Sequence, residues 1–256
     1  MINLLISNFF YRIYKLFVIF GFKTTNNFLI SIRYKFKKYN KNTIYFFHMH
    51  RSAGTSLNHY FLKINKISKY KIVRFGHSIK PRNVNFSNQN KYIFNLRHPV
   101  QLLISSFGQN KFEEINKINK INNKFKSLNS LIECLSSKNK KLKNNAFKAM
   151  NSLKSYNYRL SNFIDINFLK KRPPFHIFFY DKLQNDYEKF CKKIFLKKKN
   201  KIKVVNKNLK SKKLSKVKLS KLAKRNINNY LAEDIYIFKY IIKNKKKINN
   251  IKYSSK

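Results

Sequence analysis

Short apolar runs alternate with amphipathic segments from about residue 43 onward. Continuous apolar runs are typical of strands buried on both faces, and apolar residues that recur at helical spacing are typical of helices. The expected strands are residues 43–49, 69–75, 92–97 and 175–180. The expected helices are residues 54–64, 99–107, 181–196 and 215–243. This alternation predicts an α/β fold of three layers, with a central parallel sheet and helices on both of its faces.

The other segments complete one predicted domain, residues 41–248, which is followed by a tail at residues 249–256. Residues 111–165 are polar, rich in asparagine and lysine, and expected to be helical. The lysine-rich runs at residues 197–213 and 243–248 are interpreted as solvated surface.

Residues 1–40 are expected to form a separate N-terminal part, made of an apolar helix and a basic connector. Residues 2–20 are strongly apolar but contain Arg12 and Lys15, one helical turn apart. A membrane span needs about 20 apolar residues without central charges, so an interfacial helix or a weak signal-anchor fits this segment better. Membrane association through residues 2–20 and a helix packed on the domain both stay open. The protein is therefore expected to be membrane-associated or cytoplasmic.

The charge of the chain is extremely one-sided, with 58 lysine and arginine residues against 9 aspartate and glutamate residues. A hydrophobic content of 43% excludes a disordered polycation. No acid precedes Glu113, so the first part of the chain cannot by itself supply a carboxylate pair, a magnesium-binding aspartate or a Ser-His-Asp triad. The two cysteines are too few for a disulfide framework or a cysteine-based zinc site, and no metal is predicted. The polar groups that remain in this part of the chain are lysine, arginine, histidine and hydroxyl side chains and backbone N–H groups, which can bind anions.

The first candidate anion site follows the first predicted strand, where the chain reads His-Met-His-Arg-Ser-Ala-Gly-Thr-Ser-Leu. Gly54, Thr55 and Ser56 would open a helix there, and Arg51 lies in the loop just before it. The N-terminus of a helix offers backbone N–H groups to an anion, so this turn is interpreted as a phosphate cradle. An ordinary strand-to-helix turn with a hydroxyl cap is the simpler alternative.

The second candidate site follows the third predicted strand, which ends in Arg97. His98 and Pro99 come next, and the helix that begins there carries Ser105 and Ser106. A P-loop NTPase would need a Gly-Lys pair in its loop and a strand-end aspartate for magnesium, and the sequence has neither. Two anion sites at adjacent strand ends without a metal ligand suit a nucleotide that carries phosphates at both ends of its ribose.

These two segments resemble a known family. Residues 47–57 are similar to the F-[IV]-H-[IV]-P-K-[TC]-A-G-T-S-L segment of Golgi-type and bacterial carbohydrate sulfotransferases, and residues 96–107 are similar to that family's L-R-[DEH]-P-[VI]-x-R-[LF]-[LIV]-S-x-[YF] segment. The resemblance implies a P-loop-like sulfotransferase fold and a transferase that moves a sulfuryl group from 3′-phosphoadenosine 5′-phosphosulfate (PAPS) to a carbohydrate hydroxyl, without a metal. In the family the first segment binds the 5′-phosphosulfate and the second the 3′-phosphate. The implied cofactor-binding residues are Arg51, Ser52, Ala53, Gly54, Thr55, Ser56, Arg97 and Ser105.

Two departures qualify this resemblance, because Arg51 stands where the family has lysine and His50 where it has proline. Arginine keeps its charge but is bulkier than lysine and does not release a proton at ordinary pH. An inactive homologue that keeps the fold is therefore an alternative. Weaker similarities at Tyr156–Leu160, Phe179–Leu183 and Val205–Lys207 follow in the family's order. A Golgi membrane is the expected location if the source is eukaryotic.

The predicted catalytic residues are Arg51, for the charge on the leaving phosphate, and His77, as the base that accepts the proton of the acceptor hydroxyl. A solvent-facing turn histidine is the alternative for His77. His48 and His50 lack an evident third ligand for a metal, and His48 is interpreted as a packing residue at a strand end. His59 is interpreted as structural.

The predicted partners are the nucleotide donor and a glycan acceptor, which could be anionic, and no nucleic acid is expected. The main alternative class is a polyanion-binding or nucleic-acid-binding protein, motivated by the formal net charge of +49 and by the many tyrosine and phenylalanine residues. The chain has no recognisable helix-turn-helix, RNP or zinc element to support that alternative. A membrane-bound structural protein, resting on residues 2–20 alone, is a third reading.

Overall fold

The structure of the chain is a computed structural model. It describes residues 42–75, 79–84, 91–114, 125, 127–153, 159–194 and 217–249. At its centre lies a parallel sheet with the strand order β2-β1-β3-β4. The strands are β1 (Thr43–Phe47), β2 (Lys71–Phe75), β3 (Lys91–Leu96) and β4 (His176–Phe179).

The central strand β1 is buried along its whole length, which explains why its sequence is a continuous apolar run. Successive strand side chains point to opposite faces of the sheet. Ile44 and Phe46 belong to one core cluster, whereas Tyr45 and Phe47 belong to another on the opposite face. A sheet covered on both faces favours a nearly continuous run of apolar residues in its central strands.

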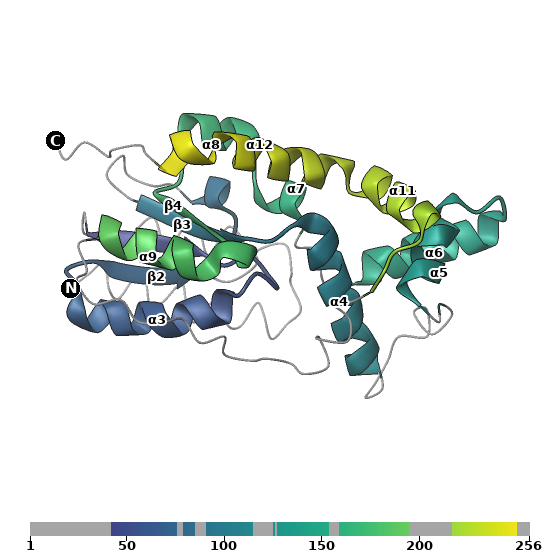
Figure 1. Cartoon of the computed structure of the whole chain (residues 1–256), viewed down its shortest axis with the longest axis horizontal. Coiled ribbons are helices and arrows are strands. Elements are labelled where there is room, and N and C mark those ends of the chain that lie inside the picture. The colour runs from purple at the N-terminus through teal and green to yellow at the C-terminus, as the bar shows by residue number, and fades with distance from the viewer. Residues whose placement is uncertain are drawn as a thin grey trace, which may run out of the picture.

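Helices cover both faces of this sheet (Figure 1). On one face, α3 (Gly54–Ile67) and α9 (Leu183–Lys193) pack against Ile44 and Phe46. On the other face lie α7 (Leu160–Phe163), α8 (Ile166–Lys171) and α12 (Ala232–Asn249). Short 3-10 turns lie at Pro81–Asn83, Cys134–Ser136 and Tyr180–Lys182. The predicted three-layer α/β architecture with a parallel sheet is therefore confirmed.

A helical lobe extends from one end of the sheet (Figure 1). It consists of the far part of α4 (Pro99–Glu114) with α5 (Leu128–Glu133), α6 (Lys140–Ser152) and α11 (Lys221–Tyr230). The lobe has its own core cluster, to which α4 contributes Leu103 and Phe107. Leu102 of the same helix instead joins a core cluster of the sheet. Helix α4 thus connects the two cores.

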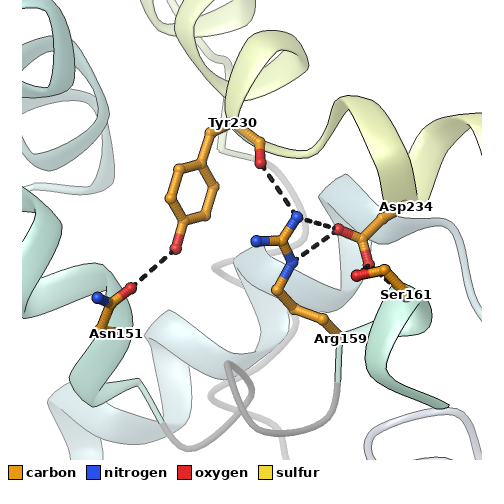
Figure 2. A network of polar contacts seen from close by, with 5 residues as sticks. All are labelled: Asn151, Arg159, Ser161, Tyr230 and Asp234. Atoms are coloured by element: carbon orange, nitrogen blue, oxygen red, sulfur yellow. Dashed lines mark hydrogen bonds and ion pairs between the residues drawn. The ribbon is translucent and has the colours of Figure 1, made fainter.

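A buried ion pair holds the lobe against the sheet layers (Figure 2). Arg159 Nε and Nη2 lie 2.7 and 2.6 Å from Asp234 Oδ2, and the Asp234 side chain is only 1% exposed. Asp234 Oδ1 accepts hydrogen bonds from the backbone N–H and the hydroxyl of Ser161. Arg159 also donates to the carbonyl oxygen of Tyr230, whose own hydroxyl lies 3.2 Å from Asn151 Oδ1. These contacts join α6, α7, α11 and α12 at one point.

The C-terminal helical segment differs from its prediction. The sequence predicts one helix over residues 215–243, but the structure has α11 and α12 with a break at Leu231. Leu231 is buried in the lobe core and has ψ near 18°, so packing of this side chain accompanies the change of direction.

In the described part of the chain, no helix is long and apolar enough to cross a membrane. Residues 2–20 lie outside that part.

Candidate functional site

The two predicted anion-binding segments lie side by side, because they follow strands that are neighbours in the sheet. The register pairs Phe47 at the end of β1 with Phe94 near the end of β3, and both strands point the same way. The carboxyl ends of parallel strands are where ligands gather in open α/β sheets. Strand β2 pairs with β1 on its other side.

The loop after β1 has an unusual backbone. Arg51 has a φ of 58° and Ala53 a φ of 64°, in the left-handed region that residues with a Cβ avoid. Ala53 is the N-cap of α3, and no side chain caps that helix. The helix also has no acidic residue in its first turn. A 14-residue helix thus begins at the sheet edge with neither a capping side chain nor a carboxylate to balance its dipole.

Asn95 holds this loop from the neighbouring strand β3. Its side chain is fully buried, and its Oδ1 accepts a 2.7 Å hydrogen bond from the backbone N–H of Met49. Its Nδ2 donates to the carbonyl oxygens of Ser52 at 2.6 Å and Met49 at 3.2 Å. Sequence reasoning missed Asn95, although one amide inside the apolar run Tyr-Ile-Phe-Asn-Leu was a usable signal.

Gly54 is required by the packing of His48. A Cβ placed on Gly54 would overlap the imidazole ring of His48, which is only 3% exposed. His48 Nδ1 lies 2.7 Å from Arg74 Nη2. Because a guanidinium only donates hydrogen bonds, Nδ1 is the acceptor and Nε2 carries the proton of the neutral ring. The structure therefore places the ring of His48 against the first residue of α3.

The hydroxyl groups around the N-terminus of α3 differ in their exposure to solvent. Ser52 is fully buried and its Oγ donates to the carbonyl oxygen of His50 at 3.2 Å. Ser56 is also buried, whereas Thr55 is exposed. Of these three predicted donor-site hydroxyls, Thr55 is the one that solvent reaches.

Arg97 reaches from the end of β3 to the loop after β1. Its Nη1 donates a 3.1 Å hydrogen bond to the carbonyl oxygen of Arg51, and its Cζ lies 4.1 Å from the ring centre of Tyr180. Its Nε is buried and has no hydrogen-bond partner among the described residues. The ion pairs of the described residues do not include Arg97, and burial lowers its pKa, although Tyr180 and Asp181 oppose that shift. The guanidinium is thus a fixed, partly buried cation without a paired carboxylate in that part of the chain.

The segment after Arg97 places the other predicted groups. Ser105 is half-buried in α4, and no hydrogen bond links it to Arg97 among the described residues. The neighbouring Ser106 is buried and donates to the carbonyl oxygen of Leu102. His98 packs edge-on against Phe238 at 5.0 Å, and burial lowers its pKa. Ser105 is therefore the more accessible hydroxyl of the pair.

The predicted base, His77, lies outside the described residues. Within the described ranges, no group of three or more histidine, cysteine, aspartate or glutamate side chains is arranged to hold a metal ion. The described groups at the sheet edge include arginines, a helix N-terminus and hydroxyls, together with the carboxylate of Asp181, which acts on the charge of Arg97. The first three kinds of group bind anions by charge and by hydrogen-bond donation.

A pocket lies beside the Arg159–Asp234 ion pair, between α4 and the C-terminal helices. Most of its lining is apolar, from residues such as Leu102, Leu103 and Met150. Its two charged residues, Arg159 and Asp234, already pair with each other. We therefore assign it to the joint between sheet and lobe.

Fold and site together define a three-layer α/β protein with a cationic edge at the carboxyl ends of its strands. Comparison with known proteins found no matching protein-family model, curated protein or solved structure.

Proposed function

We propose that this protein is a sulfotransferase that moves a sulfuryl group from PAPS to a hydroxyl of a carbohydrate acceptor. The observation that carries the proposal is the position of Arg97, a cation without a paired carboxylate among the described residues, in contact with the loop that opens α3. A binding edge with one cationic site at each of two neighbouring strands suits a donor with phosphates at two positions. The resemblance of residues 47–57 and 96–107 to sulfotransferase segments supports the same donor.

The residues present fit such a donor. The backbone from Ser52 to Ser56, at the uncapped N-terminus of α3, and the exposed hydroxyl of Thr55 would hold the 5′-phosphosulfate. Arg97, whose buried Nε has no hydrogen-bond partner in the described part of the chain, and Ser105 would hold the 3′-phosphate. The donor itself would supply the sulfuryl group and a nucleotide leaving group.

The chain's own contribution to the chemistry would be positioning and electrostatics. Arg51 stays charged at all ordinary pH values, so it would stabilise negative charge that grows on the leaving phosphate without giving up a proton. A base must accept the proton of the acceptor hydroxyl, and His77 is assigned that role by its place after β2. Association with a membrane through residues 2–20 belongs to this proposal as well.

The deciding experiment is calorimetry with 3′,5′-ADP and with 5′-AMP in the presence of EDTA. We expect the bisphosphate to bind at least about tenfold more tightly, because a charge-assisted contact to the added phosphate contributes about 1.5 to 3 kcal/mol. Equal affinities would overturn the donor assignment.

Turnover with labelled PAPS and a panel of glycans then tests the enzyme itself. Arg51→Lys should keep or raise turnover, while His77→Ala should lower it about 10²- to 10⁴-fold with little change in 3′,5′-ADP affinity. Bisphosphate binding without turnover in wild type and Arg51→Lys would favour an inactive homologue instead.

The net charge of +49 favours one second candidate, a protein that binds polyanions or nucleic acid. That activity would show a steep salt dependence and would not respond to 3′,5′-ADP. A gel-shift series in rising salt, with and without 3′,5′-ADP, separates the two candidates.

A further inference from the structure

Tyr180 lies next to Arg97 because of the register of the sheet. The pairing of β3 with β4 ends at Leu96 opposite Phe179, so the following residues, Arg97 and Tyr180, leave the sheet side by side. The tyrosine ring lies 4.1 Å from the centre of the guanidinium. At that distance the negative face of an aromatic ring attracts a cation.

Two contacts therefore define the orientation of the Arg97 guanidinium. On one side Nη1 donates to the carbonyl oxygen of Arg51, and on the other the group lies over the ring of Tyr180. The Asp181 carboxylate opposes the lowering of the Arg97 pKa, but the ion pairs of the described residues do not join the two side chains. An arginine side chain has several rotatable bonds, and contacts that hold one rotamer raise affinity by lowering the entropy lost on binding.

The exposure of Tyr180 argues that this ring is not a core residue. Tyr180 is 38% exposed, whereas Phe179, which precedes it, is 7% exposed and belongs to the sheet core. A large exposed ring adds little to core packing. Its contact with the guanidinium is the interaction that the structure gives it at this edge.

We propose that Tyr180 is a positioning residue that sets the preference for a 3′-phosphate, because it holds the Arg97 guanidinium in place. This inference rests on the proposed function. It adds a specificity-determining residue from β4 to a site otherwise formed after β1 and β3. The hydroxyl of Tyr180 has no part in the role, so a phenyl ring is sufficient for it.

The test compares Tyr180→Leu and Tyr180→Phe with wild type in calorimetric titrations with 3′,5′-ADP and with 5′-AMP. Tyr180→Leu should lower the affinity for 3′,5′-ADP by about three- to thirtyfold and that for 5′-AMP much less. Tyr180→Phe should restore the wild-type ratio of the two affinities. The control is Tyr236→Leu, since Tyr236 is an exposed tyrosine on α12, at 63%.

Urea unfolding of each variant shows whether it folds, and Tyr180→Met replaces the leucine variant if the latter does not. A general loss of structure would lower both affinities together, whereas loss of positioning lowers their ratio. If wild type prefers 3′,5′-ADP and Tyr180→Leu or Tyr180→Met keeps the same preference, the inference is wrong and the proposed function stands. If wild type shows no preference, the proposed function fails and the inference fails with it.

Discussion

The Nη1 group of Arg97 donates a 3.1 Å hydrogen bond to the carbonyl oxygen of Arg51. The two residues are 46 positions apart and follow neighbouring strands. Arg51 has a left-handed backbone, so its carbonyl oxygen is directed by a conformation that the loop alone would not favour. The guanidinium after β3 thus supports the backbone after β1, and the two candidate anion sites depend on each other.

We first predict that Arg97→Ala weakens binding at both sites. Loss of the guanidinium removes the cation for a 3′-phosphate and also the hydrogen bond to the loop that would bind the 5′ group. Affinity for 3′,5′-ADP should fall at least about tenfold, measured by calorimetry. The matched control is Arg225→Ala, since Arg225 is exposed on α11. A loss no greater than that of the control would contradict the prediction.

Asn95→Leu should destabilise the fold and disturb the loop after β1. The substitution removes a buried amide that makes three hydrogen bonds to the backbone of Met49 and Ser52. Buried backbone groups left without partners cost about 1 to 3 kcal/mol each, so the free energy of unfolding in urea should fall by at least that amount. Asn185→Leu on the exposed side of α9 is the control. Equal effects of the two leucine substitutions would show that Asn95 does not support the loop.

The contact between Gly54 and His48 is testable with a double-mutant cycle. Gly54→Ala places a methyl group into the His48 ring and should cost about 1 to 3 kcal/mol of unfolding free energy. In a His48→Ala background the same substitution should cost much less, because the obstructing ring is gone. Additive effects of the two substitutions in urea unfolding would refute the contact.

Removal of the Asp234 carboxylate should loosen the joint between sheet and lobe. Asp234→Ala leaves Arg159 without its 2.6 Å ion-pair partner, and breaking a buried pair costs about 3 to 5 kcal/mol. Glu233→Ala removes an exposed acid one position away on the same helix and should have little effect. The two variants are compared by urea unfolding. Similar unfolding midpoints would show that the Arg159–Asp234 ion pair does not stabilise the joint between sheet and lobe.

The buried His176 should make the protein less stable in acid. Burial lowers the pKa of His176 from 6.5 to about 3, with Lys193 acting in the same direction. Between these values the unfolded chain binds a proton that the folded protein does not, so stability falls as the pH falls below about 6.5. The contribution is about 1.4 kcal/mol per pH unit in that window.

This pH effect is measured by urea unfolding of wild type at about pH 7 and about pH 5. His176→Phe, which matches the surrounding phenylalanine rings, should reduce the difference between the two pH values. His59→Gln, which replaces an exposed histidine on α3, is the control. An undiminished pH dependence in His176→Phe would rule out this histidine as the cause.

The sheet and the helices beside it were predictable because their signal is local. Each strand is a continuous apolar run, and the structure places β1 to β4 within about two residues of the expected bounds. The turn at Gly54 and the arginine after β3 were also visible, since they directly follow such runs. The break at Leu231 was not, because the helical periodicity continues across it and the lobe core determines where the chain turns.

The supports of the candidate site were not predictable in the same way. Asn95, Arg74 and Tyr180 act on residues that are far from them in the sequence, through the register of parallel strands. Register follows from the packing of the whole sheet, so no single segment reveals it. The reason for Gly54 was hidden for a different cause, since the conformation of the loop after β1 brings the ring of His48 against this position.

Helix α4 gives the molecule a mechanical link between its two cores. It begins two residues after Arg97, and its 16 residues make a rod about 24 Å long. Leu102 is fixed in the sheet core and Phe107 in the lobe core. Any movement of the lobe relative to the sheet would therefore act on the first residues of α4, and those residues directly follow Arg97.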